Sequence, residues 1–109
     1  MSDDPGIAAV FATMNRAETA VLCVEALAAQ TIPPTLVVVT DNASSDDTFQ
    51  RLRSLVDLPF EFVVHRLPEN IGNAGGVRDA MEIAFDKAGI KRVVGRFLVA
   101  ADQADDVPF

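Results

Sequence analysis

The sequence predicts an α/β fold, with a Rossmann-like βαβαβαβ order in which parallel strands alternate with helices. Short and almost unbroken apolar runs recur along the chain, as expected for strands buried on both faces of a parallel sheet. Stretches in which apolar residues recur at helical spacing separate these runs. Consecutive βαβ units favour right-handed crossovers, and ligands of such sheets bind beyond the carboxyl ends of the strands.

Four apolar runs are candidate strands. Residues 7–14 form the first, residues 36–40 the second and residues 60–64 the third. Residues 93–100 form a weaker fourth candidate, because a glycine and an arginine interrupt the run. The segments that follow these runs are where functional residues are expected.

Polar residues mark the starts of the helices between these strands. Asn15 is expected to cap the first helix, with Glu18 at capping-box spacing, and Ser44 is expected to cap the second. Residues 68–76 contain three glycines and predict a loop, after which the third helix begins near Val77.

The composition bounds the class of protein. With 109 residues the chain suits one domain over residues 1–109, and its 50% hydrophobic content allows a core. Acidic residues outnumber Lys plus Arg by 16 to 9, which argues against a nucleic-acid partner but leaves room for a phosphate ligand or a divalent metal. Cys23 is the only cysteine, so no internal disulfide forms. The amino terminus lacks the basic start of a signal peptide and no apolar run approaches the roughly 18 residues of a membrane span, so we expect a cytoplasmic protein and leave peripheral membrane contact open.

Polar side chains follow the first two strands and are candidates for ligand binding. Thr13, Asn15 and Arg16 offer a hydroxyl, an amide and a guanidinium beside a helix amino terminus, whose unpaired N–H groups attract anions. Asp41 and Asn42 follow the second strand, where an acid is well placed to accept a hydrogen bond from a ribose hydroxyl or a base N–H. The alternative for both segments is ordinary turn and helix-cap chemistry, and only Asp41 and Asn42 exceed what capping needs.

The glycine-containing segment over residues 68–76 is the third candidate. Glycines allow close approach of the backbone to a ligand, and Asn70 adds an amide. Arg78 is expected in the first turn of the next helix, where a cation opposes the helix dipole, so a role with an anionic ligand is favoured over a structural one. The alternative is a flexible turn, since the segment is neither a Walker loop nor a G-x-G-x-x-G fingerprint.

Taken together, the three segments resemble the successive signatures of family-2 glycosyltransferases, which have the GT-A fold. The matching stretches are residues 10–16 (VFATMNR), residues 39–48 (VTDNASSDDT) and residues 68–76 (PENIGNAGG). The resemblance runs from about Ile7 to Val94, and the subgroup that it indicates is that of bacterial rhamnosyl- and galactofuranosyltransferase-like enzymes.

The resemblance implies a site for a nucleoside diphosphate-sugar. In the family the loop after the first strand holds the nucleotide, the acid after the second strand contacts the base or ribose, and the Asn-Gly-rich loop with the following arginine lies near the nucleotide and its pyrophosphate. Carried over to this chain, the nucleotide-sugar-binding residues are Thr13, Asn15, Arg16, Asp41, Asn42, Asn70, Gly72, Gly75, Gly76 and Arg78. The implied reaction transfers the sugar, with inversion, to a glycan or a lipid-linked acceptor, as in the synthesis of cell wall polysaccharides.

The resemblance also implies a Mg²⁺ or Mn²⁺ ion, held by an Asp-x-Asp cluster after the fourth strand and bridging the pyrophosphate. This sequence has no strict Asp-x-Asp at that place. Asp102 is the best positional match, and Asp105 and Asp106 form a carboxylate pair slightly later. The alternative for these three residues is an acidic chain end without a ligand.

The family's catalytic base and acceptor pocket lie further along the sequence than this chain extends, which predicts an incomplete, truncated or frameshifted GT-A domain. Turnover by the isolated chain is left open, and a non-catalytic nucleotide-binding remnant or interaction module is the alternative. His65, the only histidine, is expected to be structural or solvated. A response-regulator-like domain fits the length, but the acidic residues that it needs after the first and third strands are missing. Unpaired strand edges and apolar faces of an incomplete sheet predict self-association.

Overall fold

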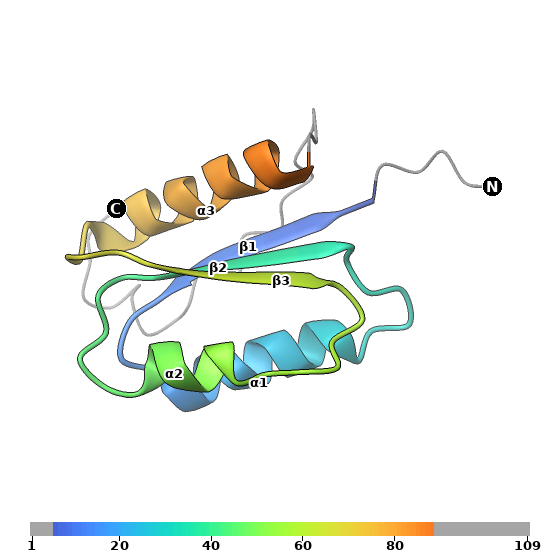
Figure 1. The fold of residues 1–109 in the computed structure, drawn as a ribbon, viewed down its shortest axis with the longest axis horizontal. Helices are drawn as coiled ribbons and strands as arrows, with labels where there is room; N and C mark the ends of the chain where they lie inside the picture. The colour runs from blue at the N-terminus through green and yellow to red at the C-terminus, as the bar shows by residue number, and fades with distance from the viewer. Residues whose placement is uncertain (1–5, 89–109) are drawn as a thin grey trace.

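Three strands alternate with three helices in residues 6–88, the part of the chain that the structure, a computed structural model, describes (Figure 1). In chain order these elements are β1 (Ala8–Thr13), α1 (Ala17–Ala28), β2 (Leu36–Asp41), α2 (Thr48–Arg53), β3 (Glu61–Arg66) and α3 (Gly72–Ala88). The strands are parallel and lie in the order β1-β2-β3. The predicted α/β, Rossmann-like fold is confirmed, while the expected fourth strand at residues 93–100 lies outside the described residues.

The helices form a layer on each face of the sheet, with α3 on one face and α1 and α2 on the other (Figure 1). Every residue of β1 and β2 is buried, which accounts for their unbroken apolar runs. β3 is one of the two outer strands of the described sheet, and its residues are half-buried or exposed. Alternate side chains of the strands therefore enter two separate cores.

The two cores differ in the size of the side chains that the helices contribute. The core under α1 and α2 consists of Ala9, Phe11, Ala20, Val24, Leu27, Val37, Val39 and Leu52. The core under α3 consists of Ala8, Val10, Leu36, Val38, Ala80 and Ala84. Because alanines form the helix side of the second core, α3 lies close to the sheet.

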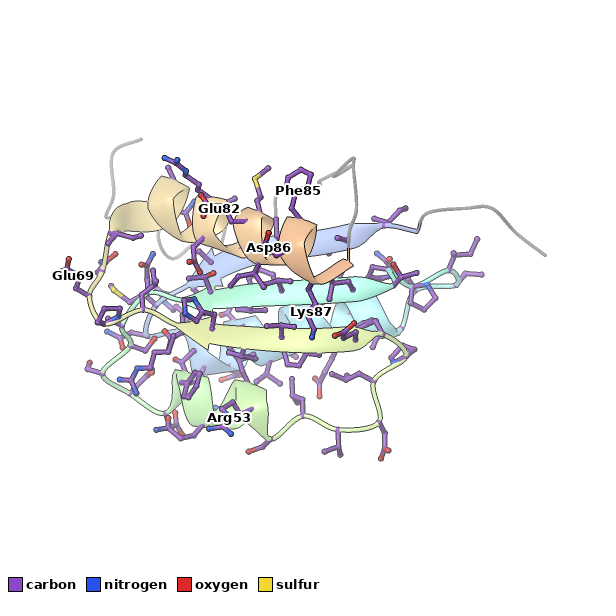
Figure 2. The ribbon with its side chains drawn as sticks, turned by 45° about the horizontal axis from the view of Figure 1, so that its top comes forward. Arg53, Glu69, Glu82, Phe85, Asp86 and Lys87 are labelled. Atoms are coloured by element: carbon purple, nitrogen blue, oxygen red, sulfur yellow. The ribbon has the colours of Figure 1, made fainter. Side chains whose placement is uncertain are left out.

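The start of α3 differs from the prediction. The helix begins at Gly72 and not near Val77, so residues 72–76 of the glycine-containing segment are the start of a helix and not a loop. Toward the other end of α3, Figure 2 shows Phe85 pointing away from the sheet and Lys87 pointing toward β3. Lys87 Nζ lies 2.8 Å from Glu61 Oε2, which fastens the last turn of α3 to the start of β3.

The burial of Leu52 makes it the anchor of the short helix α2. We expect Leu52→Ala to lower the free energy of unfolding by about 2–5 kcal/mol, because its side chain is 0% exposed and truncation leaves a cavity. Leu22→Ala in α1 is the matched control, since Leu22 is 56% exposed, and a change within about 0.5 kcal/mol is expected. Urea denaturation of both variants measures the difference, and equal losses would contradict the role given to Leu52.

Gly76 sets how closely α3 approaches the sheet. A Cβ at this position would lie 2.8 Å from Ala12 Cβ and 2.8 Å from Asn42 Nδ2, so we expect Gly76→Ala to destabilise the fold by about 1–3 kcal/mol. At Gly75 the nearest atoms to a Cβ would belong to the side chain of Ile71, at 3.0 Å. Because Ile71 is half-exposed and can move, Gly75→Ala is expected to be neutral or to stabilise by up to about 1 kcal/mol through helix propensity. Thermal unfolding of the two variants compares them, and a stable Gly76→Ala variant would show that the contact is not tight.

Candidate functional site

Three polar segments meet at the carboxyl edge of the sheet, one after each strand. Backbone hydrogen bonds join them, since Asn42 N donates to Thr13 O at 2.8 Å and Leu67 N donates to Asp41 O at 2.9 Å. The segment after β2 is therefore bonded to the segments on both sides of it. Parallel strands bring their carboxyl ends to one edge, which is why residues far apart in the sequence meet here.

The Asp41 carboxylate is the centre of the side-chain network at this edge. Asp41 is the last residue of β2 and is 0% exposed, and its Oδ1 accepts hydrogen bonds from Ser44 N at 3.1 Å and from Ser44 Oγ. Ser44 Oγ also accepts from Asn15 N at 2.8 Å, and Ser44 O accepts from Arg66 Nη2 at 2.9 Å. Ser44 thus connects the ends of all three strands.

The capping roles predicted for Asn15 and Ser44 are wrong. Arg16 occupies the N-cap of α1 and Asp47 that of α2, and neither makes a side-chain cap hydrogen bond. Asn15 has a φ of 53°, a left-handed conformation that asparagine tolerates, and its Oδ1 accepts from Ser45 N at 2.8 Å. The Asn15 side chain therefore holds the segment after β2 and does not cap its own helix.

Asn42 and Asn70 shape the entry into α3. Asn42 is 0% exposed, its Nδ2 donates to Gly72 O at 2.8 Å, and its Oδ1 accepts from Ile71 N at 3.2 Å. Asn70 Oδ1 accepts from Gly72 N at 2.9 Å. Gly72 has a φ of 87°, a left-handed conformation that glycine adopts without steric cost, so the chain can turn here from the loop into the helix.

Three buried polar atoms at this edge have no hydrogen-bond partner among the described residues, namely Thr13 Oγ1, Asp41 Oδ2 and Asn73 Oδ1. Their residues are at most 1% exposed. Thr13 and Asp41 are paired in the sheet register and are in phase with the strand residues that face α1 and α2, so their side chains lie on the same face. Asn73 belongs to the first turn of α3, on the other face. Buried acceptors and hydroxyls are costly without a partner, which marks these atoms as places for a ligand.

The two predicted arginines are both exposed. Arg16 is exposed at the start of α1. Arg78 was expected in the first turn of α3. It lies in the second turn, because the helix begins at Gly72. Its side chain is 83% exposed, and its Nε lies 3.2 Å from Glu82 Oε1. Exposed pairs of this kind are weak, so Arg78 can change partner at little cost.

Sequence reasoning missed Arg66 and Asn73. Arg66 is the last residue of β3. Its guanidinium group donates a hydrogen bond to Ser44 O, and its guanidinium carbon lies 5.7 Å from the ring centroid of Phe49. A cation at the carboxyl end of a strand was the signal that could have found it. Asn73 lies seven residues before Ala80 on the helix, a spacing that places both on the sheet side.

His65 forms a separate polar contact beside the site. Its Nδ1 lies 2.7 Å from Asp79 Oδ2, and the same oxygen accepts from Thr40 Oγ1 at 2.9 Å. The contact ties β2, β3 and α3 together, and it agrees with the structural role expected of His65. Thr40 is buried, and its hydroxyl donates to the Asp79 carboxylate and not to the histidine. Among the described residues, this cluster therefore supplies no nucleophile paired with His65.

The predicted metal ligands Asp102, Asp105 and Asp106 lie outside the described residues. Within residues 6–88 no group of three or more His, Cys, Asp or Glu side chains is arranged to hold a metal ion. None of the helices in this same range has the length and apolar composition needed to cross a bilayer.

The family of the chain follows from its sequence together with this architecture. Residues 9–102 match the family model described as glycosyl transferase family 2. No curated protein and no solved structure matches the chain. The matched range contains the described part of the sheet from Ala9 onward and the three polar segments of its carboxyl edge. The chain therefore belongs to glycosyl transferase family 2.

Proposed function

We propose that the carboxyl edge of the sheet binds the nucleotide of a nucleoside diphosphate-sugar. The observation that carries the proposal is the buried pair of unpartnered atoms, Thr13 Oγ1 and Asp41 Oδ2, on neighbouring strands. A carboxylate oxygen only accepts hydrogen bonds, so the matching ligand group is a donor. A base N–H or a ribose hydroxyl is such a donor, and either would relieve the cost of the unpartnered carboxylate oxygen.

Backbone N–H groups at this edge and two exposed arginines nearby in the sequence suit the diphosphate. Arg16 and Arg78 are exposed, and the partner of Arg78 is a surface carboxylate that binds it weakly. The amino terminus of α3, a helix of 17 residues, adds N–H groups and a favourable dipole. In this proposal Asn70, Gly72, Gly75 and Gly76 shape the backbone near the diphosphate.

The proposed reaction is transfer of the sugar, with inversion, to a hydroxyl of a glycan or a lipid-linked acceptor. The bond from the sugar C1 to the β-phosphate oxygen breaks, the acceptor oxygen bonds to C1, and a base takes the acceptor proton. We propose a donor of the rhamnosyl or galactofuranosyl class and a domain over residues 1–109 that supplies the donor side of the reaction. Asp102, Asp105 and Asp106 are the candidate ligands of Mg²⁺ or Mn²⁺, which would neutralise charge on the diphosphate leaving group.

Calorimetry with UDP, GDP and dTDP, with and without Mn²⁺, tests the proposal. We expect one of the three nucleotides to bind, and we expect Asp41→Asn to weaken that binding about 10- to 100-fold, since a hydrogen bond to a charged group contributes about 1.5–3 kcal/mol. The variant keeps Oδ1 as the acceptor for Ser44 and replaces Oδ2, which accepts, with an amide that donates.

Asp57→Asn is the matched control, because Asp57 is exposed in the turn between α2 and β3. Its affinity for the nucleotide should equal that of the unmodified protein. Circular dichroism establishes that both variants are folded. A folded, unmodified protein that binds none of the three nucleotides would refute the proposal, as would a folded Asp41→Asn variant that binds with unchanged affinity.

A further inference from the structure

We propose that Asn42 is a positioning residue that holds the first turn of α3 against the end of β2, and that it does not itself contact the nucleotide. The identity of the ligand rests on the proposed function. The contact between Asn42 and the first turn of α3, called the clamp below, exists in the protein without a ligand. Resemblance to the family places Asn42 beside the nucleotide-binding acid, and by itself leaves open whether its amide reaches the ligand.

Both polar atoms of the Asn42 amide already make a hydrogen bond within the protein. Its Nδ2 donates to Gly72 O at 2.8 Å and its Oδ1 accepts from Ile71 N at 3.2 Å, both about 30 residues away in the sequence. The side chain is 0% exposed. Unlike Thr13 and Asp41, it has no buried atom without a partner. Both polar atoms of the amide are therefore already bonded to the chain entering α3, whereas Asp41 Oδ2 is left for a ligand.

The shape of α3 fits this contact. A Cβ at position 76 would lie 2.8 Å from Asn42 Nδ2, so a glycine at this position makes room for the amide. Gly72, whose carbonyl receives the Asn42 hydrogen bond, has a φ of 87° and begins the helix. One side chain thus fixes the place where the turn starts, and a glycine one helical turn later allows it to fit.

The contact determines the spacing between two parts of the site that the proposed ligand would use. Asn42 directly follows Asp41, whose Oδ2 is an unpartnered buried acceptor. Gly72, which Asn42 binds, begins α3, whose first N–H groups the diphosphate would use. Asn42 therefore sets how far the acceptor at the end of β2 lies from the N–H groups at the start of α3. Loss of this contact would leave both present but less well placed, which weakens binding without removing a ligand contact.

Two measurements on Asn42→Ala test the proposal, namely nucleotide affinity and amide hydrogen exchange at Ile71. We expect the exchange of the Ile71 N–H to become at least about tenfold faster and the dissociation constant for the nucleotide to rise about tenfold, because the half-buried hydrogen bond between Ile71 N and Asn42 Oδ1 is lost. Ser54→Ala is the matched control, since it also removes one side-chain hydrogen bond to a backbone carbonyl, that of Ser54 Oγ to Gln50 O at 2.8 Å, at the far end of α2. It should change neither quantity.

Asn42→Asp gives a second, isosteric comparison that serves if Asn42→Ala does not fold. The carboxylate keeps an acceptor for Ile71 N, but it has no donor for Gly72 O. We expect the Ile71 amide to stay protected and the nucleotide affinity to fall. An Asp variant that binds the nucleotide as well as the unmodified protein would overturn the positioning role.

The remaining outcomes separate a positioning role from direct contact. Lower affinity in Asn42→Ala with unchanged Ile71 exchange would mean that the amide contacts the ligand, and the proposal would be wrong. Unchanged affinity and unchanged exchange would overturn it as well. If the unmodified protein binds no nucleotide, the proposed function fails, and the exchange of Ile71 alone decides whether Asn42 is a clamp.

Discussion

The hydrogen bonds from Ser44 to the buried Asp41 carboxylate are the interaction on which the carboxyl edge depends. A carboxylate that is 0% exposed is costly to bury unless it is hydrogen-bonded. Here Oδ1 receives both the backbone N–H and the hydroxyl of Ser44. Ser44 also binds Asn15 and Arg66. The hydrogen bonds that the buried Asp41 carboxylate requires therefore hold together the segments that follow all three strands.

The polar atoms of the site divide into two groups with different consequences. The side chains of Asn15, Asn42 and Asn70 bind backbone groups of other residues, so they shape the loops. Thr13 Oγ1, Asp41 Oδ2 and Asn73 Oδ1 have no partner among the described residues, and each such buried group lowers stability by about 1–3 kcal/mol. A fold that retains these costs at one edge, while satisfying the polar groups around them, is typical of a binding site.

The fold could be predicted from the sequence further than the site could. The buried strands β1 and β2 followed from apolar runs, because burial on both faces requires apolar side chains at every position. Asn15 shows why the site could not be derived in the same way. Its sequence neighbours suggest a helix cap, but its amide instead binds Ser45, 30 residues later, and only the packed sheet brings the two together. Arg78 shows a related error. Because glycine disfavours helices, the helix was expected to begin near Val77, five residues later than it does, and this put Arg78 in the first turn.

Three glycines in the first turns of α3 are unfavourable for a helix, and they have different reasons to be there. Gly72 is needed for its φ of 87°, and Gly76 for its close approach to Ala12 and Asn42. Packing gives a weaker reason for Gly75, where the nearest atoms to a Cβ belong to the half-exposed Ile71 side chain. A helix amino terminus that must bring its backbone against a diphosphate gives a further one, because a bare backbone leaves room for the ligand. The glycine that internal packing explains least is therefore the one that the proposed nucleotide-sugar site accounts for.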